Sequence, residues 1–222
     1  MTNTGPKARG RAATGVWALI HTERAALAND LIGLTEERWK TPSLCAGLSV
    51  REVLAHLTAS ASLTPLNWLA GVIRCRFDFD KQVAMRLAEH LGADGAETLE
   101  RFRRVVASTT KPPLPKMALL GEGIVHAEDI RRPLGIRRDY PIAVLTSLAG
   151  YYQGADLVVM AKGRIGGLRL EATDGPFAVG SGPLVSGTTL ALTMAMTGRT
   201  AYLAELTGDG VPILRRRVPP LG

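Results

Sequence analysis

The chain has few of the features on which secreted and membrane proteins depend. It contains only two cysteines, Cys45 and Cys75, among 222 residues, which excludes a disulfide framework. Gly, Arg, Asp or Lys interrupts every apolar run before it reaches the roughly 20 residues of a membrane span. The first residues lack the charged and then apolar pattern of a signal peptide. We therefore expect a cytoplasmic protein without a membrane partner, in which Cys45 is a buried turn residue.

Excess charge is scarce outside the two ends of the chain. The net charge is +7, and three cations within residues 1–12 and three at residues 215–217 account for nearly all of it. Aromatic residues are only 5% of the chain, and none alternates with these cations as in a nucleic-acid interface. The basic ends leave a nucleic-acid binder open as a hypothesis, but we expect them to be solvated termini, with residues 1–12 a disordered basic head.

The periodicity of the apolar residues changes once along the chain. Apolar residues are 46% and charged residues 21% of the sequence, as in a globular protein. Helical spacing predicts an up-and-down helical bundle over residues 13–161. After Gly166 and Gly167, alternation predicts a small C-terminal α/β domain over residues 166–218. Its expected elements are a strand at 168–172, a hairpin partner at 177–179, a helix capped by Ser186, a short helix at 201–206 and a strand at 211–214. The predicted fold class is mainly α with a small α+β part.

A capping box begins one of the predicted bundle helices. Ser49 is followed three residues later by Glu52, the spacing at which the two side chains cap each other's backbone. The helix that follows carries His56 on the flank of its apolar stripe. His56 is therefore expected to face the bundle interior or a cleft beside it, where it is available to bind a ligand.

The stretch of residues 121–135, GEGIVHAEDIRRPLG, carries the most specific chemistry. Glu122 and His126 are four residues apart, so they lie on one face of a helix about one turn apart. A carboxylate above an imidazole is half of a metal site. Among the four histidines, which also include His21 and His90, the best third ligand is His56. From spacing alone, an ordinary surface pair or a core histidine stays an alternative.

These residues resemble the mycothiol-dependent maleylpyruvate isomerase family. The resemblance rests on residues 121–135, on TPSLCAGLSVREVLAHL at residues 41–57 and on GDGV at residues 208–211. It implies a DinB-like helical bundle followed by a small α/β domain related to sterol-carrier domains. It also implies a divalent metal held by His56, Glu122 and His126, and mycothiol as the thiol cosubstrate. Leu48 replaces the tryptophan that is usual in the family after the Cys-x-Gly turn.

Metal chemistry connects these implications to a reaction. Two imidazoles and a carboxylate suit Zn²⁺, and three protein ligands leave positions open, as in catalytic sites. A thiol on such an ion is deprotonated, and the thiolate adds to an electron-poor double bond. We therefore expect a thiol transferase or a cis–trans isomerase whose partners are mycothiol and a small electrophilic substrate, in a monomer or homodimer.

Two further residues are candidates for a catalytic role. Asp129, three residues after His126, is placed to accept the other ring N–H of a ligand histidine or to pair with Arg131 or Arg132. Arg199 follows the helix stop at Gly198, where the family resemblance implies a basic residue that faces the active cleft and binds a substrate carboxylate bidentately; the alternative is a solvated helix end. The alternative function is a non-catalytic metal-binding or small-ligand-binding protein on the same fold.

Overall fold

The structure is a computed structural model that describes residues 15–156 and 159–218. The predicted head, residues 1–12, lies outside the described residues. In chain order the elements are α1 (Val16–Asp30), α2 (Glu36–Trp39), α3 (Val50–Ser62), α4 (Pro65–Arg74), α5 (Phe79–His90), α6 (Gly95–Val105), α7 (Lys116–Arg131), α8 (Ile142–Tyr152), α9 (Ala161–Ile165), β1 (Arg169–Ala172), β2 (Ala178–Gly180), β3 (Leu184–Gly187), α10 (Thr189–Met196), the 3-10 helix η1 (Thr200–Glu205) and α11 (Val211–Arg217).

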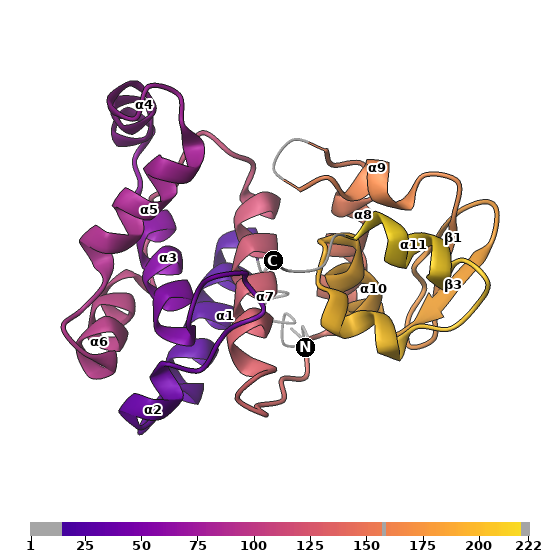
Figure 1. Cartoon of the computed structure of the whole chain (residues 1–222), viewed down its shortest axis with the longest axis horizontal. Coiled ribbons are helices and arrows are strands. Elements are labelled where there is room, and N and C mark those ends of the chain that lie inside the picture. The colour runs from indigo at the N-terminus through magenta and orange to yellow at the C-terminus, as the bar shows by residue number, and fades with distance from the viewer. Residues whose placement is uncertain (1–14, 157–158, 219–222) are drawn as a thin grey trace, which may run out of the picture.

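The N-terminal half is a helical bundle, as predicted. α3 packs against α5, α6 and α7, and α1 packs against α6 and α7 (Figure 1). The predicted capping box is present, because Glu52 N donates to Ser49 Oγ at 3.4 Å and Ser49 N donates to Glu52 Oε2 at 2.7 Å. Pro65 starts the separate helix α4 after α3 ends at Ser62. The capping box therefore fixes the start of the helix that carries His56.

The C-terminal half is a small α/β unit around a three-stranded sheet of order β2-β1-β3. β1 pairs antiparallel with β2 and parallel with β3, so Leu170 faces Val179 on one side and Val185 on the other. α10 contacts the sheet, η1, α8 and α9. The predicted fold class, a mainly helical protein with a small α/β part, is confirmed. The limits 13–161 and 166–218 stay a prediction, since α8 contacts both α7 and α10.

Two local predictions in this half are wrong. Ser186 does not cap a helix but lies in β3, and Thr188 caps α10 by accepting a hydrogen bond from Ala191 N at 3.2 Å. Residues 211–214 are not a strand but part of α11. Pro212 stands in the first turn of α11 and three arginines stand in its last turn, and both features stabilise a helix.

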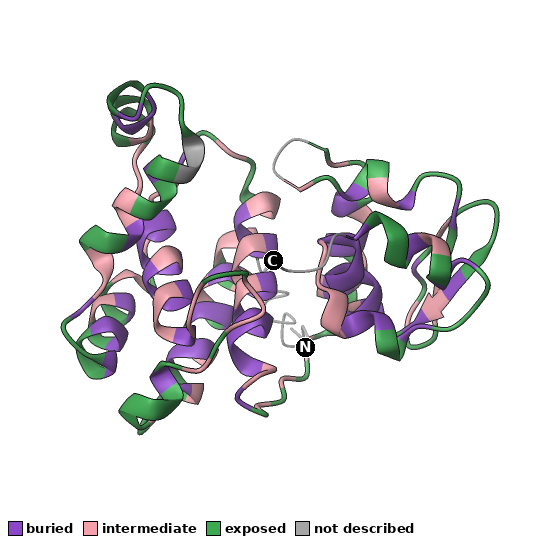
Figure 2. Cartoon of the chain, in the orientation of Figure 1, coloured by how far each residue is buried: buried purple, intermediate pink, exposed green. Residues whose placement is uncertain are grey.

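α7 packs against both halves of the molecule. Its residues Leu120 and Ile124 belong to the apolar core of the C-terminal half, and Ala127 and Ile130 belong to the core of the bundle. After its exposed first residue, Lys116, α7 is buried or half-buried to its end, and Figure 2 shows it between the two halves. A helix enclosed on opposite sides is held rigidly, which makes α7 a fixed support for a site.

Unlike α7, the outer edge of the bundle exposes apolar side chains. α4 lies at an outer edge of the bundle in Figure 1, and its apolar residues Leu66, Leu69 and Ile73 are exposed. The exposed Phe77 follows in the next turn. Despite this apolar surface, no helix within residues 15–156 and 159–218 is long and apolar enough to cross a membrane.

Candidate metal centre

The neighbouring helices α3 and α7 bring the three predicted ligands together. His56 Nε2 lies 3.3 Å from Glu122 Oε1, and the rings of His56 and His126 meet edge to face with centroids 5.0 Å apart. One ligand atom from each of the three residues lies within 4.8 Å of the other two. Their side chains are 22%, 25% and 18% exposed in the order His56, Glu122, His126. The triad is therefore compact and keeps contact with solvent.

The two carboxylate oxygens of Glu122 have different neighbours. Ser60, one turn after His56 on α3, donates its hydroxyl to Glu122 Oε2 at 2.6 Å. The other carboxylate oxygen, Oε1, faces His56. Ser60 thus selects which oxygen of Glu122 is directed toward the two imidazoles.

His126 is oriented by Asp129, as the sequence analysis suggested. His126 Nδ1 lies 2.8 Å from Asp129 Oδ2. A carboxylate only accepts hydrogen bonds, so Nδ1 carries the proton and Nε2 keeps its lone pair. The alternative partners of Asp129 are engaged elsewhere, because Arg131 pairs with Asp30 and Arg132 pairs with Glu205. The contact is of the kind that fixes a metal-binding imidazole.

Arg199 comes to the same carboxylate from the C-terminal half. Its Nε donates to Asp129 Oδ1 at 3.0 Å and its Nη2 to Asp129 Oδ2 at 2.7 Å, and its Nη1 donates to Thr197 O at 2.9 Å. Gly198 makes the turn before it at φ 98°, a conformation that favours glycine. Arg199 is therefore neither a solvated helix end nor a direct neighbour of the three ligands, but the partner of Asp129.

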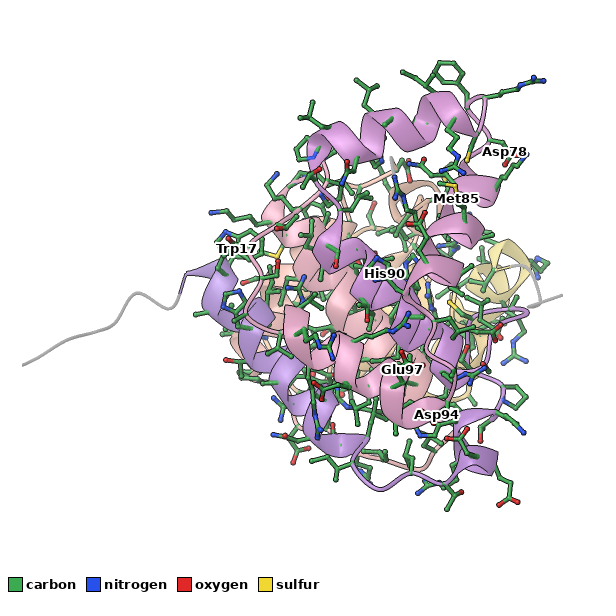
Figure 3. All side chains as sticks on the ribbon, turned by 90° about the vertical axis from the view of Figure 1, so that its left-hand side faces the viewer. Trp17, Asp78, Met85, His90, Asp94 and Glu97 are labelled. Carbon is green, nitrogen blue, oxygen red and sulfur yellow. The ribbon has the colours of Figure 1, made fainter. Side chains whose placement is uncertain are left out.

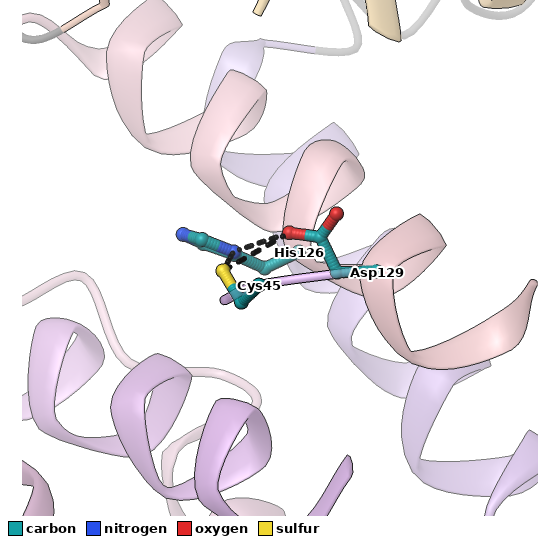
Figure 4. Close-up of side chains that lie close together, drawn as sticks. All are labelled: Cys45, His126 and Asp129. Atoms are coloured by element: carbon teal, nitrogen blue, oxygen red, sulfur yellow. Dashed lines mark hydrogen bonds and ion pairs between the residues drawn. The ribbon is translucent and has the colours of Figure 1, made fainter. Parts of the chain in front are cut away.

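Cys45 lies next to both members of the His126–Asp129 pair (Figure 4). Its Sγ is 3.6 Å from His126 Nδ1 and 3.5 Å from Asp129 Oδ2. The thiol is half-buried rather than fully buried as expected. Burial and the negative charge of Asp129 raise the pKa of Cys45 to about 12, so the thiol is neutral and an inert neighbour. Cys45, His126 and Asp129 form a second set of metal-ligand types, but Arg199 already neutralises Asp129.

The charges of the site stabilise each other. Burial opposes the ionised form of Glu122, but the hydrogen bond and charge of His56 outweigh it and lower the pKa of Glu122. Burial similarly opposes the charged form of His56, and Glu122 outweighs it and raises the pKa of His56. Burial lowers the pKa of His126, which keeps this imidazole neutral. A neutral imidazole beside a carboxylate is the protonation state that a metal ion requires.

A second polar cluster is centred on Glu128 of α7, two residues after His126. Glu128 is buried and accepts hydrogen bonds from the hydroxyls of Tyr140 and Tyr202, both at 2.7 Å. Arg131 donates to Asp30 at 2.8 Å and to Tyr140 at 2.7 Å. Like Asp129–Arg199, the Tyr202–Glu128 contact joins α7 to the C-terminal half. These contacts hold the two halves in register around the triad.

The remaining histidines are not part of the site. His21 Nε2 lies 3.2 Å from Ser108 O, and His90 is in the last turn of α5 on the face turned away from the C-terminal half (Figure 3). Sequence reasoning missed Ser60, whose spacing four residues after His56 could have indicated it. It also missed the buried cation Arg24, whose pKa is lowered by burial and raised by the charge of Glu122.

Comparisons with known proteins concern the family and the fold of the chain. Residues 20–113 match the family model described as the mycothiol maleylpyruvate isomerase N-terminal domain. No curated protein matches the chain. Two similar crystal structures are a histidine-to-alanine mutant of the mycothiol-dependent maleylpyruvate isomerase, with 14% identity and a TM-score of 0.61, and the same isomerase without a named mutation, with 13% identity and a TM-score of 0.59. Each covers 87% of this chain and 91% of its own. At this identity the likeness concerns the fold.

Proposed function

Residues 20–113 are an N-terminal domain of the mycothiol maleylpyruvate isomerase family, and from this premise we propose that the protein is a metal-dependent enzyme that uses a thiol cosubstrate. The observation that carries the proposal is the convergence of His56, Glu122 and His126 within 4.8 Å. Mycothiol is the proposed thiol, because the two similar structures are of an isomerase named for its dependence on it. The proposed reaction is thiol transfer to, or cis–trans isomerisation of, a small electrophile with an electron-poor double bond.

The residues present fit a divalent ion. Two imidazole nitrogens and one carboxylate oxygen suit Zn²⁺, and three protein ligands leave positions for a further ligand. Ser60 binds Glu122 Oε2 and Asp129 binds His126 Nδ1. Glu122 Oε1 and His126 Nε2 are therefore the atoms that would bind the ion. When bound, the ion would lower the pKa of a thiol that reaches it, so that the nucleophilic thiolate predominates near neutral pH.

Asp129 and Arg199 have distinct proposed roles. Asp129 holds the proton on His126 Nδ1 and thereby fixes the ring. Arg199 has five N–H groups, of which two donate to Asp129, one to Thr197 O and one to Cys45 Sγ at 3.8 Å. One N–H group remains uncommitted among these described contacts. We therefore propose that the positive charge of Arg199 attracts a substrate carboxylate and that one N–H group donates to it, so that the contact is a single hydrogen bond rather than a bidentate pair.

A thiol-consumption assay tests the proposal. Metal-loaded protein is mixed with an electrophilic substrate panel and with either mycothiol or cysteine, and both the loss of free thiol and the cis–trans conversion of the substrate are followed. Glu122→Gln keeps the size of the side chain but removes the anionic ligand. The matched control is Glu100→Gln, an exposed carboxylate on α6. We expect activity in the wild type and in the control but not in Glu122→Gln.

The alternative function predicts a different outcome of the same assay. A non-catalytic metal-binding or small-ligand-binding protein would neither consume thiol nor isomerise a substrate in this assay. Activity that survived Glu122→Gln in full would contradict the metal–thiolate mechanism itself.

A further inference from the structure

Two buried tyrosines, Tyr152 and Tyr202, and the half-buried Tyr140 lie near α7, and Tyr152 differs from the other two. Tyr140 and Tyr202 both donate their hydroxyls to Glu128. Tyr152, at the end of α8, is only 4% exposed, and among the described residues its hydroxyl makes no hydrogen bond. Its ring packs in the apolar core that also contains Leu148 and Ile124. Tyr152 is thus a buried residue whose hydroxyl has no partner among the described residues.

Gly121 makes room for this hydroxyl next to the metal ligand Glu122. A Cβ at position 121 would lie 2.3 Å from the Tyr152 hydroxyl oxygen and 2.9 Å from Leu148 Cδ1, closer than real Cβ contacts. The glycine therefore allows the α8 tyrosine to rest against the α7 backbone one residue before Glu122. Gly123, two residues later, has nothing within 4 Å of its Cβ position, so the α7 surface on that side of Glu122 is open.

The electrostatic surroundings of the hydroxyl are those of the site. Burial raises the pKa of Tyr152, the positive charge of Arg199 lowers it, and the negative charge of Glu122 raises it. The hydroxyl is therefore protonated at neutral pH and free to donate. A buried donor without a partner costs free energy unless a ligand satisfies it, and no described residue does so.

We propose that the Tyr152 hydroxyl donates a hydrogen bond to the substrate oxygen on which negative charge develops. This inference rests on the proposed function and deepens it, because it requires an electrophile whose double bond is conjugated to a carbonyl group. Donors fixed in place before charge develops stabilise the transition state because they need no reorganisation. The packed ring of Tyr152 fixes its position, and its hydroxyl lies against Gly121 of α7.

The step balances without a further reactant. The thiolate sulfur forms a bond to the β-carbon, and the π pair of the double bond moves through the conjugated system onto the carbonyl oxygen. Tyr152 keeps its proton and donates a hydrogen bond to that oxygen. In the reverse direction the C–S bond breaks and the electron pair returns to sulfur. Rotation before the reversal gives isomerisation, and protonation of the adduct carbon by water gives transfer.

Tyr152→Phe tests the role, with Tyr151→Phe as the matched control one residue earlier. Thiol consumption is measured with but-3-en-2-one, which has a carbonyl group, and with benzyl chloride, which has none. We expect Tyr152→Phe to lower kcat with the ketone on the order of 100-fold and to leave the benzyl chloride rate unchanged. Equal losses with both electrophiles, or no loss with either, would overturn the proposal while leaving the proposed function intact.

A second measurement does not depend on turnover. Butan-2-one, a saturated analogue, should perturb the tyrosine absorption of the wild type and of Tyr151→Phe, but not of Tyr152→Phe. If the wild type neither consumes thiol nor isomerises a substrate, the proposed function fails, and this spectrum then tests only whether Tyr152 binds a carbonyl oxygen. A perturbation that persists in Tyr152→Phe would overturn it. Thermal unfolding checks the variant, and we expect no loss of stability because the hydroxyl removed has no protein partner.

Discussion

The two ends of the polar surface of α7 are built in opposite ways. At Glu122 and His126 the side chains are 25% and 18% exposed, and Ser60 or Asp129 binds only one of the two polar atoms of each. One to two turns later, the side chains of Asp129 and Arg131 are 0% exposed, and Asp129 is bound by both His126 and Arg199. The first group is left open for a ligand, whereas the second is saturated by the protein.

This difference separates binding from support. A saturated buried ion pair contributes little net stability but is costly to break, because the partner left behind stays buried and uncompensated. An open cluster of metal-ligand groups gains a further partner when an ion binds, and binding to the folded state then stabilises it. Mutations in the saturated group should therefore act on folding, whereas mutations in the open group should act on metal binding.

The largest expected effect comes from breaking the saturated group. Asp129→Ala leaves the Arg199 guanidinium buried without its carboxylate and frees the His126 ring. We expect a loss of about 3–5 kcal/mol in the free energy of unfolding, measured by urea denaturation. The exposed Asp209→Ala is the control and should change little. A loss below about 1 kcal/mol for Asp129→Ala would show that the pair is not what holds the two halves together.

The open group predicts stabilisation by added metal. Zn²⁺ at a free concentration of 100 times its Kd should stabilise the wild type by about 2.7 kcal/mol, read as a rise in Tm. His56→Ala should lose this response, whereas His90→Ala, on the outer face of α5, should keep it. An equal rise in Tm for the His56→Ala protein would mean that the ion binds elsewhere.

Ser60 sharpens the comparison within the open group. Ser60→Ala removes the hydroxyl that holds Glu122 Oε2, and contacts of this kind are worth about 10–100-fold in metal affinity. We expect weaker binding by about 10-fold in a competition titration with a chelator. Ser62→Ala removes a hydroxyl that donates only to Thr58 O and should bind metal as the wild type does. Equal affinities for both variants would assign Ser60 to helix packing alone.

The smallest effect is expected at the rim between the halves. The Arg132 guanidinium pairs with Glu205 and lies 4.1 Å from the Tyr202 ring centroid. Both charged side chains are more than a third exposed, at 35% for Arg132 and 41% for Glu205. Solvent screens such a pair, so Arg132→Ala should cost about 1 kcal/mol in urea denaturation. A cost as large as that of Asp129→Ala would remove the distinction between rim and buried contacts.

The parts of the molecule that local rules determine were predictable. The capping box at Ser49 and Glu52 and the four-residue spacing of Glu122 and His126 are local patterns, and His56 is the best third ligand among the four histidines, a choice that the family resemblance also implies. The structure brings these three side chains together; that they bind an ion stays a prediction. Cys45 and Tyr152 could not be placed from the sequence, because they reach the site only through loop and helix packing that spans dozens of residues.

The errors in the C-terminal half have a different origin. β3 alternates over only four residues, and its pairing with β1 is set by a connection through β2 that no local pattern reports. The segment after Gly210 contains β-branched and apolar residues, which favoured a strand. The helical signals of Pro212 and the following arginines were present but were outweighed by the Gly-Asp-Gly turn before them.

Absorption spectroscopy of the cobalt(II)-loaded protein tests the central claim most directly. Cobalt(II) substitutes for zinc at sites of this donor type, and a thiolate on the ion gives a charge-transfer band that nitrogen and oxygen donors lack. The account predicts no such band before thiol is added, because Cys45 is not a ligand, and a band after addition of mycothiol to the wild type but not to His56→Ala. A band already present without added thiol, or one that forms equally in His56→Ala, would contradict the account.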